Sequence, residues 1–162
     1  MSEINITKGK LLKNSVEVEY TSTLPGKKPK SCSEESDNLP KQSLITAFDK
    51  LAIHAALCGE FINPVKNIDK ADPELIKDFK VTGFSLSESK KNGDGVILTG
   101  HKTLSSGKIL GFNTPTIHFE DDSENAYPHM GKLVSCIETC KDEIRAYLNC
   151  EYAEDPQTKL AL

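Results

Sequence analysis

The chain has 162 residues, of which 37% are hydrophobic and 27% charged, and it carries a net charge of −4 with a pI near 5.6. This length suits one domain that buries its own core without disulfides or metals, and the composition excludes a fully disordered chain. The acidic pI argues against a basic nucleic-acid-binding domain, and no apolar run approaches the roughly 18 residues of a membrane span.

The distribution of charge and the cysteines bear on the expected cellular compartment and partners of the protein. Residues 1–31 hold six lysines and three glutamates, a charge of +3, which leaves −7 for the rest of the chain. No export signal is recognisable, so we expect a cytoplasmic protein without membrane association. The five cysteines are expected to be reduced thiols, as that compartment favours.

A β-hairpin is predicted at the N-terminus. Residues 4–12 form one apolar-rich run, and Ser15 to Tyr20 alternate strictly between polar and apolar side chains, as a strand with one buried face does. Lys13 and Asn14 suit the turn between them.

Residues 24–42 are rich in Pro, Gly, Ser and charged residues, which predicts a flexible loop, with a binding loop as the alternative.

Two amphipathic helices are predicted. The first begins at Pro40 with Asn38 as its N-cap, ends at Gly59, and has apolar residues at helical spacing at Leu44, Phe48, Leu51, Ala55 and Cys58. A short helical turn follows, with Asp72 as its cap and Pro73 at its first position. The second helix is predicted from Tyr127 to Tyr152, and its wide apolar stripe leaves a homodimer open.

A three-stranded antiparallel meander is predicted between the helices, over residues 79–119. Residues 80–86, 96–100 and 109–113 are the strands, and glycine-containing turns at 90–95 and 105–108 separate them. Gly83 predicts a bulge in the first strand, and Pro115 places residues 113–119 at an edge of the sheet.

Together these elements predict an α+β domain over residues 1–153. Its antiparallel sheet consists of the β-hairpin and the meander, packed by two helices in the order ββ-α-βββ-α. Residues 154–162 contain a proline and no periodicity and are expected to form a frayed tail.

No motif predicts catalysis, a cofactor or a metal. The sequence has no phosphate-binding loop, dinucleotide fingerprint, HExxH pair or nucleophile elbow. Cys136 and Cys140 lie four residues apart but without a matching second pair, so they are expected to be core residues and not zinc ligands. His54 is expected to be a packing residue. The sequence therefore predicts a protein that is not an enzyme.

Parts of the chain resemble small proteins of unassigned role from phages and prophages of gut bacteria. The resemblance rests on Ile6–Leu12, on Val81-Thr82-Gly83 and on Ser105–Pro115, and it extends from Ile4 to about Cys150. It implies a role in phage DNA replication or recombination, or in suppression of host defences. It brings no catalytic residues.

Two functions follow as hypotheses. The first is a binding protein that inhibits a host nucleic-acid-handling or defence protein, or sequesters its nucleotide signal, in the host cytoplasm. Its acidic contacts to a basic partner surface would be Glu120, Asp121, Asp122 and Glu124. The alternative is an accessory single-stranded DNA-binding or annealing factor, whose phosphate contacts would be Lys8, Lys10, Lys13, Lys27, Lys28 and Lys30.

Overall fold

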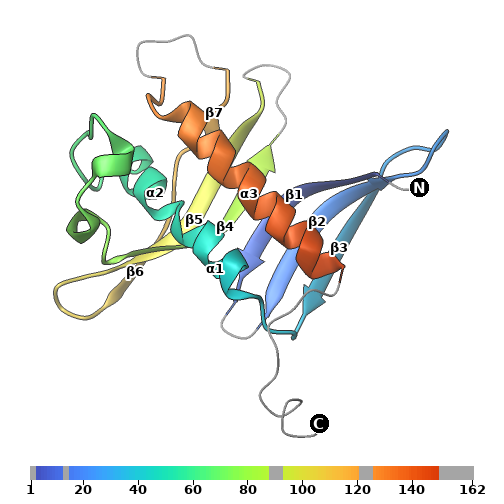
Figure 1. Ribbon diagram of the computed structural model, residues 1–162, viewed down its shortest axis with the longest axis horizontal. Helices are drawn as coiled ribbons and strands as arrows, with labels where there is room; N and C mark the ends of the chain where they lie inside the picture. The colour runs from blue at the N-terminus through green and yellow to red at the C-terminus, as the bar shows by residue number, and fades with distance from the viewer. Residues whose placement is uncertain (1–2, 13–14, 88–92, 121–125, 150–162) are drawn as a thin grey trace, which may run out of the picture.

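The computed structural model describes residues 3–12, 15–87, 93–120 and 126–149, and it has the α+β architecture predicted from the sequence (Figure 1). The strands are β1 (Glu3–Leu11), β2 (Val16–Thr23), β3 (Lys30–Ser36), β4 (Phe79–Ser87), β5 (Gly95–Thr103), β6 (Ile109–Asn113) and β7 (Ile117–His118). The helices are α1 (Gln42–Asp49), α2 (Ala52–Cys58) and α3 (Met130–Leu148), with the short 3₁₀ helices η1 (Ile68–Lys70) and η2 (Pro73–Leu75).

All strands belong to one antiparallel sheet with the order β3-β2-β1-β4-β5-β6, and β7 pairs with β5 beyond the end of β6. The helices α1, α2 and α3 lie on one face of this sheet (Figure 1). α3 runs antiparallel to α1 and α2, because Ser43 at the start of α1 donates to Glu143 (2.8 Å) while His54 in α2 lies beside Cys136. None of the three described α-helices lies on the opposite face of the sheet (Figure 1).

The core lies between the sheet and the helices. It is built from alternate strand residues such as Val16, Val18 and Leu98 and from the inner stripes of the helices. Phe48 of α1 packs against Phe84 of β4 with ring centroids 5.8 Å apart. α3 crosses β1 at Gly9, where a Cβ atom would come within 2.5 Å of Ile144 Cδ1. A larger residue at this position would force the Ile144 side chain to move, so glycine lets the helix pack directly on the strand.

The first predicted helix is interrupted. α1 ends at Asp49 and α2 begins at Ala52, and the position before α1 is Lys41, which makes no side-chain cap bond. Asn38 is not the cap, since its side-chain amide donates to Ser36 Oγ (2.8 Å). Asp72 does cap the predicted turn: its carboxylate accepts from Glu74 N (3.0 Å). No helix among the described residues is long and apolar enough to cross a membrane.

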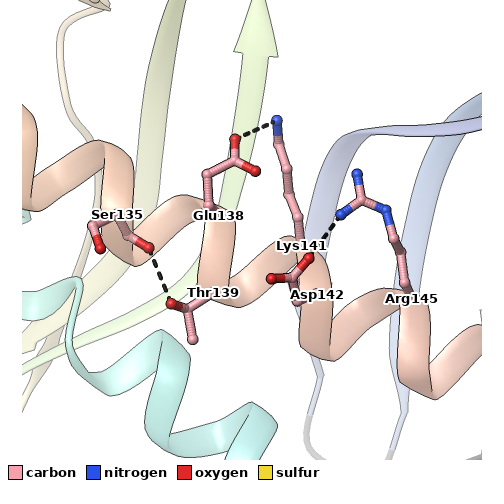
Figure 2. A network of polar contacts seen from close by, with 6 residues as sticks. All are labelled: Ser135, Glu138, Thr139, Lys141, Asp142 and Arg145. Atoms are coloured by element: carbon pink, nitrogen blue, oxygen red, sulfur yellow. Dashed lines mark hydrogen bonds and ion pairs between the residues drawn. The ribbon is translucent and has the colours of Figure 1, made fainter.

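The outward face of α3 is polar, which corrects the prediction of a wide apolar stripe. Figure 2 shows the ion pairs Glu138–Lys141 (3.3 Å) and Asp142–Arg145 (3.0 Å) along this face, where Thr139 Oγ1 also donates to Ser135 O (3.0 Å). Such exposed i,i+3 pairs contribute only about 0.2–0.5 kcal/mol each. The buried residues of α3 are Leu133, Ile137, Cys140, Ile144 and Tyr147, whereas Val134 is exposed.

Residues 24–42, predicted as a flexible loop, contain the strand β3, so the sheet has more strands than predicted. β3 pairs with β2 along its whole length, from Val16–Ser36 to Ser22–Lys30. Its side chains are mostly exposed, which explains why its sequence has no hydrophobic pattern. Backbone pairing with β2 does not need such a pattern. A side-chain bond adds to it: Tyr20 donates to Glu34 (2.8 Å), and that bond raises the pKa of Tyr20 to about 12.

The sheet consists of two similar halves. The first repeat is β1-β2-β3 followed by α1 and α2, and the second repeat is β4-β5-β6 followed by β7 and α3. The first strands of the two repeats pair with each other at the centre of the sheet, through residues 8–10 and 83–85. Gly9 and Phe84 face each other in this register, so an approximate two-fold axis passes between them.

Both central strands have a bulge at the same place in the repeat. The register of β1 on β2 shifts at Thr7, and the register of β4 on β5 shifts at Thr82, beside Gly83 as predicted. Each threonine hydroxyl donates to a carbonyl of the next strand, Thr7 to Glu19 O (3.1 Å) and Thr82 to Thr99 O (3.5 Å). The shared bulge is independent support for the repeat, because a bulge needs a specific local geometry.

Other predicted features are confirmed or fall outside the described residues. The 105–108 turn is formed with Gly107 at φ +83°, a value that favours glycine. Pro115 lies between β6 and β7 at the sheet edge. α3 occupies Met130–Leu148 of the predicted Tyr127–Tyr152. The Lys13-Asn14 turn, residues 90–92 of the 90–95 turn and the predicted tail at 154–162 lie outside the described residues.

Candidate functional site

The outer edge of the second repeat is formed by β6. Leu104 N donates to Lys108 O (2.8 Å) at its start and Thr114 N donates to Leu98 O (2.9 Å) at its end. Because pairing groups alternate along an antiparallel strand, the N–H and C=O groups of Ile109, Gly111 and Asn113 point away from β5. No described strand pairs with that side.

This edge is also apolar at one end. Ile109 is 66% exposed and Leu110 is 43% exposed, and Leu104 lies across the turn from them. A Cβ built on Gly111, between these residues and Asn113, would meet nothing within 4 Å, so the middle of the edge is open. Exposed apolar edge strands readily pair with another chain, and proteins normally protect them.

The other end of the same edge is acidic. Glu120 follows β7 and is exposed, and Phe119 N donates to the carbonyl of Asp94 (2.9 Å), which places an exposed aspartate next to it. Glu120 is thus the one predicted acidic contact whose position is described. Asp121, Asp122 and Glu124 lie outside the described residues. We call the unit formed by β6, β7, Asp94 and Glu120 the docking edge.

The predicted nucleic-acid contacts do not gather at one place. Lys8 and Lys10 lie on β1, opposite Glu19 and Glu17 of β2, so acidic residues accompany them. Lys27 and Lys28 lie in the β2–β3 turn, and Lys30 begins β3 beside that turn, opposite Ser22 of β2. Lys13 is not among the described residues. The described lysines therefore form two separated groups rather than a continuous phosphate-binding track.

A buried polar cluster joins the helices of the two repeats. His54 of α2 is 2% exposed, its Nδ1 lies 2.6 Å from Tyr127 Oη, and its Nε2 lies 3.9 Å from Cys136 Sγ of α3. The geometry resembles a thiol with a base oriented by a third group. The nearby His129 donates from Nε2 to Val65 O (2.8 Å).

The electrostatics of this cluster disfavour an activated thiol. Burial, together with the neighbouring His129, lowers the pKa of His54 to about 4. Burial also raises the pKa of the Cys136 thiol, although Lys50 and Lys132 oppose that shift, and it raises the pKa of Tyr127. At neutral pH all three groups are uncharged, whereas a nucleophilic cysteine needs its thiolate. The cluster fits a packing role for His54.

Sequence reasoning did not find this cluster, because its members are far apart in the chain and belong to no motif. Nor did it find the docking edge as a whole, since only the acidic half has a compositional signal. Among the described residues, no group of three or more His, Cys, Asp or Glu side chains could hold a metal ion.

Comparison of the chain with protein-family models, with curated proteins and with solved structures found no match.

Proposed function

We propose that this protein is a non-catalytic binding protein that inhibits a host protein by docking on it through the docking edge. The observation that carries the proposal is the unpaired outer side of β6 with Ile109 and Leu110 exposed beside it. A partner with an extended segment could add a strand to β6 through backbone hydrogen bonds, and its apolar side chains would cover the exposed isoleucine and leucine.

The acidic end of the docking edge supports a basic partner surface. Glu120 and Asp94 lie beyond β7, and the chain after residue 31 carries −7 in total. A basic groove in a nucleic-acid-handling or defence protein has the complementary charge, which would speed association and select the partner. The resemblance to phage proteins supports the same class of target, in the host cytoplasm.

The test is affinity capture from a nuclease-treated lysate of the host bacterium, with quantitative mass spectrometry. Wild type is compared with Ile109→Lys, which places a charge on the apolar end, and with Glu120→Lys, which reverses the acidic end. Leu24→Lys is the matched control, because Leu24 is 47% exposed but lies in the turn after β2. We expect one stoichiometric partner with wild type and Leu24→Lys, loss with Ile109→Lys, and partial loss with Glu120→Lys.

Two results would contradict this proposal. Equal recovery of the partner by Ile109→Lys would exclude the docking edge. Recovery only of nucleic acid, or of proteins lost on nuclease treatment, would favour the single-stranded DNA alternative, and that binding should then weaken steeply with salt.

A further inference from the structure

The seam between the two repeats opens into a cleft. β1 and β4 pair only where residues 8–10 meet residues 83–85, and the bulge at Thr82 ends this pairing. Beyond it the strands diverge, and a cleft of about 510 Å³ lies between the end of β1 and the start of β4. Pockets between structural units are frequent ligand sites.

The two sides of this cleft differ in chemistry. The first repeat contributes an apolar wall with Leu11, Leu39 and Ile45, and the second repeat contributes Lys80, Thr82 and His101. Lys80 and His101 are opposite each other in the β4–β5 register, so both side chains lie on the same face of the sheet. None of the described residues that line the cleft has a carboxylate, although the protein as a whole has a net charge of −4.

Both walls have binding capacity that the protein itself does not use. Nδ1 of His101 is buried and has no hydrogen-bond partner among the described residues, and buried polar atoms are nearly always paired in native proteins. On the apolar wall, Leu39 is 44% exposed. Lys80 is exposed as well and has no ion-pair partner within the described part of the chain, so a ligand in the cleft would meet a cation next to an uncovered apolar surface.

We propose that this cleft binds an amphipathic anion, with an apolar chain or ring against Leu39 and Ile45 and a carboxylate or phosphate monoester at Lys80 and His101. The Lys80 ammonium would donate to the anionic head beside His101, and Thr82 borders the same wall. The cleft lies between β1 and β4, inside the sheet order, whereas the docking edge is at β6. Binding here is therefore independent of the proposed docking function.

The test uses octanoate as the probe, followed by ¹H–¹⁵N chemical shifts and by calorimetry on the full chain. Octanol lacks the anion and acetate lacks the apolar chain, so both should bind at least about ten-fold more weakly if both walls contribute. We expect the saturable shifts to map to residues 11–12, 39–45 and 80–82. Octyl phosphate is a parallel probe, and the tighter of the two anions identifies the head group that the cleft prefers.

Variants test how much each wall of the cleft contributes to the affinity for octanoate. Lys80→Met keeps the apolar stem and removes the charge, and it should weaken octanoate at least about five-fold. Leu39→Asn should weaken it too, whereas Lys66→Met, which changes an exposed lysine outside the cleft, should leave the affinity unchanged. Octanol binding as tightly as octanoate, unchanged affinity in Lys80→Met, or no saturable binding of either anion in the millimolar range would overturn the proposal.

Discussion

The two repeats of this protein have the same inner strands and different outer strands. At the centre, β1 and β4 pair across the approximate two-fold axis and each carries a threonine bulge. At the periphery, β3 carries Glu34 and Glu35 among serines, whereas β6 carries exposed Ile109 and Leu110. A polar edge discourages pairing with another chain and an apolar edge permits it. The inner strands β1 and β4, which are alike in the two repeats, join the two halves of the fold. The outer strand β6, which differs from β3, is the element to which we assign the proposed function.

The two repeats also differ at the axis itself, where the first has a glycine and the second has a phenylalanine. Phe84 is 1% exposed, and its ring lies close to Gly9, where a Cβ atom would come within 3.1 Å of Phe84 Cε1. One phenyl ring thus fills space on both sides of the axis. Two phenylalanines could not be accommodated there, because protein interiors are close-packed.

The largest expected effect comes from breaking this asymmetric contact. Phe84→Ala should lower the free energy of unfolding by about 3–5 kcal/mol, the usual loss for deleting a buried phenyl ring. Urea denaturation measures it, and Ser85→Ala, a change at the next residue of the strand, should stay within about 0.5 kcal/mol. A loss below about 1 kcal/mol for Phe84→Ala would mean that the two repeats do not depend on this ring.

A second effect concerns the buried cluster that joins α2 of the first repeat to α3 of the second. The folded-state pKa of His54, about 4, lies below the ordinary value of 6.5, so the unfolded chain binds a proton that the folded chain rejects. Unfolding free energy should therefore fall as the pH drops from about 6.5 to 4, by up to about 3 kcal/mol from this residue.

His54→Gln removes the titrating group and provides the control for that measurement. Both proteins are unfolded in urea at each pH. Between pH 6.5 and 4 the free energy of unfolding should fall less in this variant than in wild type, and the difference is the contribution of His54. Parallel curves for wild type and His54→Gln would show that the imidazole is not kept neutral in the folded protein.

The smallest expected effect sharpens the comparison of the two bulges. Thr7→Val should cost about 1 kcal/mol, since it removes a hydroxyl bond of ordinary length. Thr82→Val should cost less, because its hydroxyl lies 3.5 Å from the acceptor, compared with 3.1 Å for Thr7. Thermal unfolding of the two single variants tests the order. A larger loss for Thr82→Val would show that the second bulge depends more on its hydroxyl.

Much of the fold could be predicted because local pattern and tertiary burial agree. The alternation of Val16 and Val18 marks β2, and the apolar spacing of Leu133, Ile137 and Ile144 marks α3, and all of these residues are buried as expected. The short turn that contains Gly107 could be predicted in the same way. β3 was missed because its side chains contribute little to the core, so its only strong signal is backbone pairing with β2.

The candidate sites were less readable. The acidic run suggested a partner surface, but Ile109 and Leu110 look like ordinary strand residues until the sheet order shows that β6 has an unpaired side. His54 is 73 residues from Tyr127 and 82 residues from Cys136, so its contacts with them could not be inferred from spacing.

The sequence by itself determined the fold class, the central meander and the long helix, because hydrophobic periodicity and turn residues act over a few neighbouring positions. Only the tertiary structure decided that β1 and β4 meet at an approximate two-fold axis, that a cleft opens at their seam, and that β6 ends the sheet. These features depend on which distant strands pair, and backbone hydrogen bonds between strands are chemically alike whatever the side chains. Long-range pairing is therefore set by how the whole core packs.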